Sequence, residues 1–264
     1  MLVLLHRDYD ALSGAAARII ATAVRRKASF VLGLASGGTT AGMYRELVRM
    51  HREEALDFSK TVTFNLDEYI GLAPEHPRSF HNFMERNLFS GVNIPHANIH
   101  IPDGTVRAGY EEYCQSYEDA IRSAGGIDLQ ILGIGRDGHI GFNEPASSLG
   151  SRTRPKTLSR TTLEDNRRDF APGEDMPDCA ITMGIGTILE ARRIVLLASG
   201  SAKAKAVAKA IEGPITASVS ASALQLHPDV TFLLDEQAAA DLTQAEYYRR
   251  VMEMTAKLTP ERLW

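Results

Sequence analysis

Cysteine is scarce in this chain, because Cys114 and Cys179 are the only two among 264 residues. Two thiols so far apart supply neither a disulfide framework nor a cluster of thiolate metal ligands. Such usage is typical of proteins from a reducing compartment. We therefore expect both residues to be ordinary thiols.

An excess of positive charge is also missing. The 29 lysines and arginines are outnumbered by 33 aspartates and glutamates, which gives a formal net charge of −4. A surface that binds nucleic acid usually carries a basic footprint, so we expect no nucleic-acid partner. Local basic residues can still hold one small anion.

Long apolar runs are absent as well. No run approaches the roughly 20 residues that cross a membrane, and the apolar start Met1–Arg7 is too short for the core of a signal peptide. The composition, 44% hydrophobic and 23% charged, is ordinary for a soluble globular protein. These features predict a cytoplasmic protein with no membrane partner.

No linker, internal repeat or low-complexity tract interrupts the chain, which favours a single domain over residues 1–264. After a first strand that begins by about residue 2, short apolar runs alternate with helical patterns. We predict strands at Phe30–Leu34, Thr61–Leu66, Leu129–Leu132, Ile194–Ala198 and Val230–Leu234. We predict helices at Tyr9–Lys27, Ala41–Arg52, Ser79–Leu88, Tyr110–Ala124, Ala202–Ile211 and Glu236–Lys257. This alternation indicates the α/β class, with a mainly parallel sheet and helices on both faces.

One segment, Arg160–Pro177, is polar, mixed in charge and without periodicity. Irregular segments longer than about 12–15 residues are often lids or binding loops. We expect an active-site lid at about 160–177, with a plain surface excursion as the alternative.

A glycine turn follows the strand at Phe30–Leu34 and opens the next helix. Backbone N–H groups and the helix dipole make such a turn an anion site, and it contains Ser36, Gly37, Gly38 and Thr39. The stretch nearly spells a nucleotide P-loop, but Thr39 stands where the lysine that reaches the terminal phosphates belongs. The pattern favours one phosphate monoester, unless the glycines serve only a tight turn.

Two cations are candidates to complete this anion site. Arg168 lies in the predicted lid, and Lys203 follows the Ser199-Gly-Ser turn between a strand and a helix. Taken alone, each is more often a solvated surface charge, but the Gly-Ser turn that opens a helix makes the two interpretations of Lys203 equally good.

The segment Gly133-Ile-Gly-Arg-Asp-Gly-His-Ile-Gly-Phe-Asn-Glu-Pro145 follows another apolar run. It contains a Gly-x-Gly-x-x-Gly pattern, but no helix signal follows, and Arg154–Thr157 occupy the region where the ribose-binding acid belongs. We therefore predict no dinucleotide. Asp137, His139 and Glu144 instead indicate proton transfer, although a histidine at this place is more often structural when it stands alone.

A second acidic position, Asp67-Glu68, ends the strand at Thr61–Leu66. A carboxylate at the carboxyl end of a strand is a candidate general base, and capping of the following turn is the alternative. No His, Cys or Asp cluster has convincing metal-ligand spacing, so we predict no metal. Ser147-Ser148 lacks the nucleophile elbow of serine hydrolases.

These pieces together resemble the glucosamine-6-phosphate deaminase family over nearly the whole length. The resemblance rests on Leu32–Thr39, Phe64–Tyr69, Ile127–Pro145, Ser147–Arg154, Gly184–Thr187 and Leu224–Pro228. It implies a modified Rossmann-like three-layer α/β sandwich that binds no nucleotide. It also implies a hydrolase of amino sugar metabolism that converts glucosamine 6-phosphate and water to fructose 6-phosphate and ammonia, without metal or organic cofactor.

By position, the resemblance gives Asp67 the role of the base that moves the C2 proton to C1. It gives His139, assisted by Asp137 and Glu144, the opening of the pyranose ring. The phosphate-binding positions fall on Ser36, Gly37, Gly38, Thr39, Arg168 and Lys203. This chain departs from the family around Arg168, where charged residues replace small or apolar ones.

Some members of the family are hexamers that N-acetylglucosamine 6-phosphate activates between subunits. Ser147, Arg154 and Lys156 match positions used there, so a homo-oligomer with an allosteric site is a hypothesis for this chain. Two alternatives remain for the activity. One is 6-phosphogluconolactonase, which shares the Gly-x-Asp-Gly-His core, and the other is a non-catalytic sugar-phosphate sensor domain.

Overall fold

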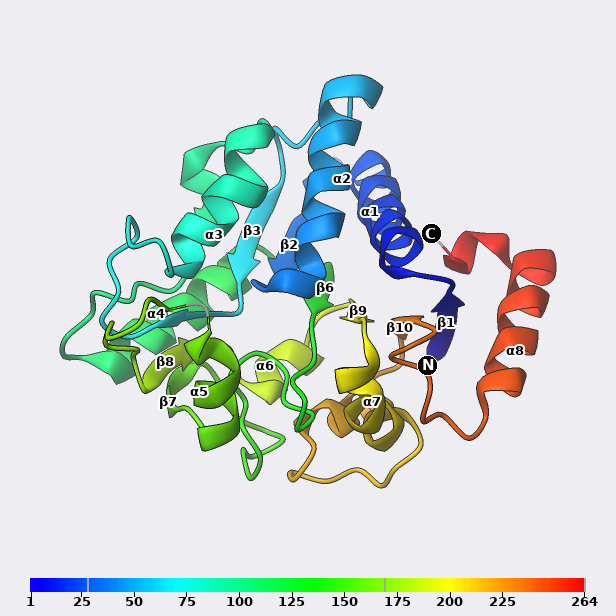
Figure 1. Ribbon diagram of the computed structural model, residues 1–264. Helices are drawn as coiled ribbons and strands as arrows, with labels where there is room; N and C mark the ends of the chain where they lie inside the picture. Colours follow the sequence, from blue (N-terminus) through cyan, green and yellow to red (C-terminus); the bar gives the residue numbers. More distant parts are fainter. Residues whose placement is uncertain (28, 169, 264) are drawn as a thin grey trace.

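The computed structural model describes residues 1–264 apart from Ala28, Asp169 and Trp264. Its central sheet has seven strands in the order β1-β10-β9-β6-β2-β3-β5, and all their pairings are parallel (Figure 1). The strands are β1 (Leu2–His6), β2 (Val31–Leu34), β3 (Val62–Asn65), β5 (Ile99–His100), β6 (Leu129–Leu132), β9 (Arg193–Ala198) and β10 (Val230–Asp235). The predicted parallel sheet is confirmed.

Helices cover both faces of this sheet (Figure 1). One face packs against α1 (Tyr9–Arg26), α2 (Gly38–Glu54) and α3 (Phe80–Asn87). The other packs against α4 (Tyr110–Ser123), α6 (Ile185–Leu189) and α7 (Ala204–Ile211). Successive strand side chains alternate between the two cores, since Val31 belongs to one and Leu32 to the other. The three-layer α/β arrangement expected from the resemblance is therefore confirmed.

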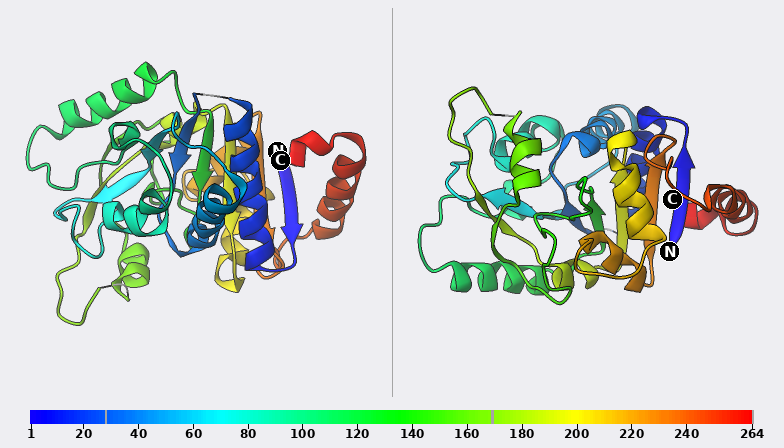
Figure 2. Two further views of the ribbon diagram at one scale, coloured as in Figure 1. Left: turned by 90° about the horizontal axis from the view of Figure 1, so that it is seen from above. Right: turned by 60° about the horizontal axis from the view of Figure 1, so that its bottom comes forward.

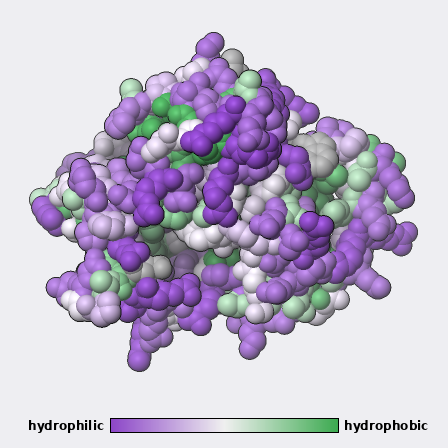
Figure 3. All heavy atoms as spheres, turned by 45° about the horizontal axis from the view of Figure 1, so that its top comes forward, coloured by the Kyte–Doolittle hydropathy of each residue, from purple (hydrophilic) through white to green (hydrophobic). Residues whose placement is uncertain are grey.

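Short 3-10 helices complete the described chain, at Phe89–Gly91, His96–Asn98, Ser201–Lys203, Ser220–Leu226 and Pro260–Leu263. Among the described residues, no helix is both long and apolar enough to span a membrane. Hydrophilic residues cover most of the face shown in Figure 3, where hydrophobic residues gather in a few small areas.

A second, antiparallel sheet was not predicted. It consists of β4 (Asp67–Tyr69), β8 (Cys179–Thr182) and β7 (Arg154–Thr157), with β8 in the middle. The strands are three or four residues long, and two of them carry charged residues, so they show no apolar run. A small aromatic core around Tyr69, Phe142 and Phe170 packs beside them.

The segment predicted to be irregular contains a helix, α5 (Arg160–Arg167). Ser159 caps it by accepting a hydrogen bond from the backbone N–H of Thr162 at 3.2 Å. Thr162 is the buried residue of this helix, Leu163 packs partly buried against the aromatic core, and the other residues are polar. The apolar periodicity by which helices are predicted is therefore missing here.

The last predicted helix begins too early, because α8 spans Ala245–Leu258 and the residues before it form turns. Two carboxylates bind backbone N–H groups in this stretch. The carboxylate of Asp235 accepts the backbone N–H of Ala238, and that of Glu212 accepts the backbone N–H groups of Thr243 and Gln244. Helix α8 lies outside the edge strand β1 (Figure 2).

An ionic cluster joins three segments at the amino end of β6. Asp128 is 8% exposed, and its carboxylate accepts hydrogen bonds from Lys27 Nζ at 2.6 Å, Arg192 Nη1 at 3.0 Å and the backbone N–H of Val31 at 2.9 Å. The cluster thereby connects the end of α1, the start of β2 and the turn before β9. It lies at the sheet edge opposite the carboxyl ends of the strands.

We expect Asp128→Asn to lower the free energy of unfolding by about 1.5–3 kcal/mol, because charge-assisted hydrogen bonds are lost. Urea unfolding measures this change. Asp119→Asn removes an exposed acid paired with Arg122 on α4 and is the matched control, with an expected change below about 0.5 kcal/mol. Equal effects of the two variants would contradict a stabilising role of Asp128.

Candidate active site

Four neighbouring strands, β9, β6, β2 and β3, end at one edge of the sheet. The chain leaves β2 toward β3 on one side and continues from β6 toward β9 on the other, so the strand order reverses between β6 and β2. In open α/β sheets, ligands bind outside the carboxyl ends of the strands at such a point. The turns that contain the predicted phosphate-binding and catalytic residues follow these strands.

The glycine turn after β2 opens helix α2 without a capping side chain. Gly37 is the N-cap residue, with a φ of 153°, and a Cβ built on Gly38 would meet no atom within 4 Å. The hydroxyl of Thr40 donates to the backbone oxygens of Ala35 and Gly37 and not to a ligand. The start of α2 thus has free space beside Gly38 for an anion, although the backbone N–H of Thr40 already donates to Gly37 O.

Ser36 and Thr39 flank this turn and are half-buried. The side-chain amide of Asn65, at the end of β3, lies 3.5 Å from Ser36 Oγ and donates toward it. Asn65 is fully buried, and sequence reasoning gave it no role. Its place at the carboxyl end of the strand predicted at Thr61–Leu66 was the signal that could have indicated one.

The turn before Lys203 is fixed by a buried carboxylate. Asp235 accepts the backbone N–H of Gly200 at 3.0 Å and the hydroxyl of Ser199. Gly200 has a φ of 88°, which favours glycine. Lys203 is half-buried behind this turn.

The structure brings Lys203 close to two arginines. Burial lowers the pKa of Lys203, the nearby Asp165 opposes this shift, and the cations Arg136 and Arg168 add to it. Arg168 lies exposed at the end of α5. No sequence pattern marked Arg136 as a site residue, because it stands between the glycines and acid–base residues of the turn after β6. Three cations therefore share the carboxyl edge of the sheet.

Asp137, His139 and Glu144 form a compact trio after β6. The Nδ1 atom of His139 lies 2.7 Å from Asp137 Oδ1 and 3.7 Å from Glu144 Oε2. The backbone N–H of His139 also donates to Asp137 Oδ1, at 3.1 Å. A Cβ on Gly135 would meet the imidazole within 2.3 Å, so this glycine makes room for the ring. The arrangement confirms that these three side chains come together.

The two carboxyl groups of the trio have different environments. Burial raises the pKa of Asp137, but the contacts with His139 outweigh it, and the net result is a lowered pKa. Glu144 is 3% exposed, and its Oε1 accepts the backbone N–H of Ser159. Its Oε2 has no hydrogen-bond partner among the described residues. An imidazole between an ionised carboxylate and a second buried carboxyl group is suited to relay a proton.

These three groups also have the donor types of a metal site, and their ligand atoms lie within 4.8 Å of one another. Two ligands of one tetrahedral ion stand about 3.3 Å apart when each bond is about 2.0 Å long. The Nδ1 to Oδ1 distance of 2.7 Å is shorter, as in a direct contact of the two side chains without an ion between them. This distance fits a bound metal ion poorly, so we keep the prediction that no metal binds here.

Asp67 is the first residue of β4 and is 6% exposed. Its carboxylate lies beside Gly141, where a Cβ would stand 3.3 Å from Oδ2. Burial, and then the neighbouring Glu68, raise the pKa of Asp67 from 3.8 to about 8, although the backbone N–H of Phe142 partly offsets them. Such a carboxylate is a strong base near neutral pH.

Glu68 has the capping role, which the sequence left open as the alternative for this acidic position. Its buried carboxylate accepts the backbone N–H groups of Tyr69, Phe80 and His81 at 2.8–3.0 Å, and it contacts His81 Nδ1 at 3.1 Å. It therefore binds the amino end of α3, whose N-cap is Ser79. Of the two adjacent acids, Glu68 is the cap and Asp67 remains available.

Two of the three residues matched to an effector site, Arg154 and Lys156, lie on β7. Arg154 donates from Nη1 to Asn143 Oδ1 at 2.9 Å, next to Glu144. Lys156 is two residues further, on the same face of the strand, and half-buried. Ser147 is 3% exposed. The structure thus connects Arg154 to the catalytic loop within one subunit.

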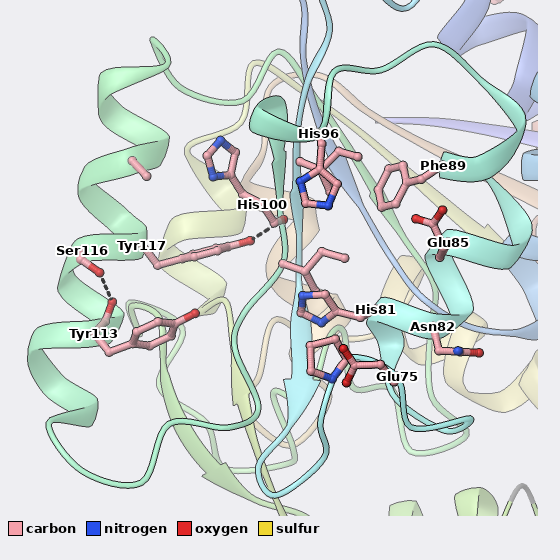
Figure 4. A pocket seen from close by; sticks show the side chains of 14 residues that line it. Glu75, His81, Asn82, Glu85, Phe89, His96, His100, Tyr113, Ser116 and Tyr117 are labelled. Atoms are coloured by element: carbon pink, nitrogen blue, oxygen red, sulfur yellow. Dashed lines mark hydrogen bonds between the residues drawn. The ribbon is translucent and has the colours of Figure 1, made fainter.

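A pocket of about 590 Å³ lies elsewhere, between α3, β5 and α4 (Figure 4). It is lined by aromatic side chains and by His81, His96 and His100. None of the predicted site residues lines it. His81 connects it to Glu68, the residue after Asp67. The carboxyl edge of the sheet, and not this pocket, contains the groups suited to the chemistry.

Comparisons with known proteins identify the family of this chain. Residues 8–232 match the model of the family described as glucosamine-6-phosphate isomerases/6-phosphogluconolactonase. The glucosamine-6-phosphate deaminase of Thermoanaerobacter pseudethanolicus is 49% identical over 91% of this chain and 94% of its own length. That of Hahella chejuensis is 52% identical over 88% of each chain.

Solved structures show the same relationship. A monomeric glucosamine-6-phosphate deaminase superposes with a TM-score of 0.89 at 46% identity, covering 91% of this chain and all of its own. The 6-phosphogluconolactonase of Trypanosoma brucei reaches a TM-score of 0.71 at 21% identity, covering 92% and 98%, and shares the fold alone.

The raised pKa of Asp67 makes a prediction about stability. Because the folded state favours the protonated carboxyl, its contribution to stability is complete below pH about 4 and is lost as the pH rises through about 8. Asn does not ionise, so we expect the stability of Asp67→Asn relative to the unmodified protein to increase from pH 5 to pH 9. Urea unfolding at both pH values measures this difference. A difference that does not change with pH, as expected for the exposed control Asp119→Asn, would refute the buried position of the carboxylate.

Proposed function

Because this chain belongs to the family of glucosamine-6-phosphate isomerases and 6-phosphogluconolactonases, we propose that it converts D-glucosamine 6-phosphate and water to D-fructose 6-phosphate and ammonia. The observation that carries this proposal is the presence of two separate proton-transfer groups. One is the buried Asp67, and the other is the trio of Asp137, His139 and Glu144. An aldose–ketose isomerisation needs one group at C2 and one at the ring oxygen.

The reaction begins with opening of the pyranose ring. His139, oriented by Asp137 and assisted by Glu144, moves a proton from the O1 hydroxyl to the ring oxygen. The C1–O5 bond of the hemiacetal breaks, O5 becomes the C5 hydroxyl, and C1 becomes an aldehyde carbon. The short contact with Asp137 stabilises the imidazolium that forms on the way.

Asp67 then takes the proton from C2 and delivers it to C1 through an enolamine. At pH 7, a pKa of about 8 leaves roughly a tenth of the Asp67 carboxyl ionised, and this ionised form is unusually basic for a carboxylate. The imine left at C2 adds water and releases ammonia, which gives the ketone of fructose 6-phosphate. These steps involve only the substrate, water and protons.

The phosphate group of the substrate occupies the glycine turn at the start of α2. Ser36, Gly37, Gly38 and Thr39 supply hydrogen-bond donors, and Arg168 and Lys203 supply the charge. The isolated turn without a P-loop lysine fits one phosphate monoester. Residues 1–264 act in this proposal as one domain, whose lid at about 160–177 includes α5.

The residues support 6-phosphogluconolactonase activity less well. Ester hydrolysis of a lactone needs no base beside C2, whereas Asp67 is buried with a raised pKa at the edge that carries the trio. A non-catalytic sugar-phosphate sensor domain would not need these proton-transfer groups.

Regulation and location are further proposals. Arg154, Lys156 and Ser147 suit a site for N-acetylglucosamine 6-phosphate between subunits of a homo-oligomer, with Arg154 connected to Asn143 beside Glu144. The monomeric deaminase with a similar fold makes a monomer the competing state. A cytoplasmic location fits the two unpaired thiols, Cys114 and Cys179.

The direct test incubates the purified protein with glucosamine 6-phosphate in the presence of EDTA and measures both products. We expect ammonia and fructose 6-phosphate in equal amounts, at a rate that EDTA does not change, because the trio needs no ion. Loss of activity with EDTA that zinc restores would overturn the metal-free mechanism. Hydrolysis of 6-phosphogluconolactone without formation of ammonia would favour the lactonase.

A second prediction separates ring opening from proton transfer. We expect His139→Gln to lower kcat by about 10²–10⁴-fold with the cyclic sugar, because general acid–base catalysis contributes this much. An open-chain substrate analogue bypasses the step, so its turnover should fall far less. Equal losses with both substrates would show that His139 does not act in ring opening.

A further inference from the structure

One charged contact connects the predicted lid to the catalytic turn. The guanidinium of Arg136 donates from Nε to Asp165 Oδ2 at 2.8 Å, and Nη2 pairs with Oδ1 of the same carboxylate. Arg136 lies directly before Asp137, and Asp165 lies on α5, three residues before Arg168. A two-bond contact of this kind fixes the orientation of both groups.

The remaining contacts of α5 show what this pair adds. Ser159, before the helix, donates its backbone N–H to Glu144, and Asn166 donates to the hydroxyl of Tyr69 at 2.8 Å. Both are neutral donors at the ends of the helix. Among the ion pairs of the described residues that involve α5, Arg160–Glu164 lies within the helix, whereas Arg136–Asp165 leads to another element.

The same pair lies inside the group of cations at the phosphate site. Lys203 is close enough to Asp165, Arg136 and Arg168 for each of them to affect its charge. Without an acid, three cations at one place would repel each other and drive the exposed Arg168 away. Asp165 reduces this repulsion, and its bond to Arg136 keeps the end of α5 at the site.

We propose that Arg136 and Asp165 are positioning residues that hold α5 against the catalytic turn, so that Arg168 stays beside Lys203 to bind the phosphate of the substrate. This inference rests on the proposed function, since it gives the pair a role in binding that substrate. Neither residue reacts with the sugar.

The proposal and simple electrostatics predict opposite changes in the KM for glucosamine 6-phosphate when Asp165 is replaced by Asn. If Asp165 acted only through its charge, its removal would make the site more positive and lower the KM for glucosamine 6-phosphate. If it holds α5, its removal releases the helix and raises KM. Because the pair is partly exposed, we expect an increase of about two- to fivefold at low ionic strength, with kcat changed less than twofold.

The matched control is Glu164→Gln, one position earlier on the same helix. It removes the same charge and breaks the exposed pair with Arg160, without touching the catalytic turn. We expect its KM to equal that of the unmodified protein or to fall slightly. A rise equal to that of Asp165→Asn would overturn the proposal, and so would a lower KM in Asp165→Asn.

A double variant tests whether the two residues act together. Arg136→Gln is expected to raise KM by a similar factor, and adding Asp165→Asn should cause little further change, because the contact is already lost. Fully additive effects would show that the two residues contribute independently, which contradicts a pair that acts as a unit.

Hydrogen exchange gives a readout that needs no turnover. We expect the backbone amides of Arg160–Arg167 to exchange faster in Asp165→Asn than in Glu164→Gln, while those of the central sheet stay unchanged. Equal exchange in the two variants would overturn the proposal. A protein that produced no ammonia would refute the proposed function, and the exchange measurement would still decide whether the pair holds α5.

Discussion

Burying two adjacent carboxylates is the constraint on which the site depends. Glu68 receives the backbone N–H groups at the start of α3, so its charge is compensated by hydrogen bonds. Asp67 obtains no comparable set, and burial raises its pKa to about 8. The fold thereby makes a cap from one acid and leaves its neighbour, the proposed base, without such hydrogen bonds. The antiparallel sheet of β4, β8 and β7 is what takes Asp67 out of solvent while leaving it beside the loop that carries the trio.

The catalytic groups and the ionic cluster at Asp128 occupy opposite ends of the same strands. At the amino end of β6, Asp128 binds two cations and a backbone N–H, which secures the sheet. At the carboxyl end, Gly135 and Gly138 let the chain turn sharply around His139. Stability and chemistry are thus separated along β6, so that the strained turns after it do not have to hold the sheet together.

The sequence predicted six of the seven strands of the central sheet, most helices and the grouping of Asp137, His139 and Glu144, because short apolar runs and a short spacing carry that information. It missed β5, which has only two residues. It could not predict β4, β7 and β8, since strands of three or four residues with charged positions show no period. Helix α5 escaped for a similar reason, because its stability comes from Ser159 and from contacts to distant segments. The choice between Asp67 and Glu68 also needed the structure, since only the position of α3 shows which acid receives the N–H groups. The role of Arg136 depends on a partner 29 residues away, which no local pattern indicates.

Three separate parts of the proposed site contact the same helix, α5. Its first end contacts Glu144 through Ser159, its middle contacts Arg136, and its last turn contacts Tyr69 in the strand of Asp67. A phosphate bound between Arg168 and Lys203 would therefore favour the same position of α5 that keeps Glu144 and Tyr69 in place. Binding energy from the phosphate, which does not react, can in this way be used to order the groups that do react. That coupling explains why a polar helix with little apolar area to bury packs over the carboxyl edge of the sheet.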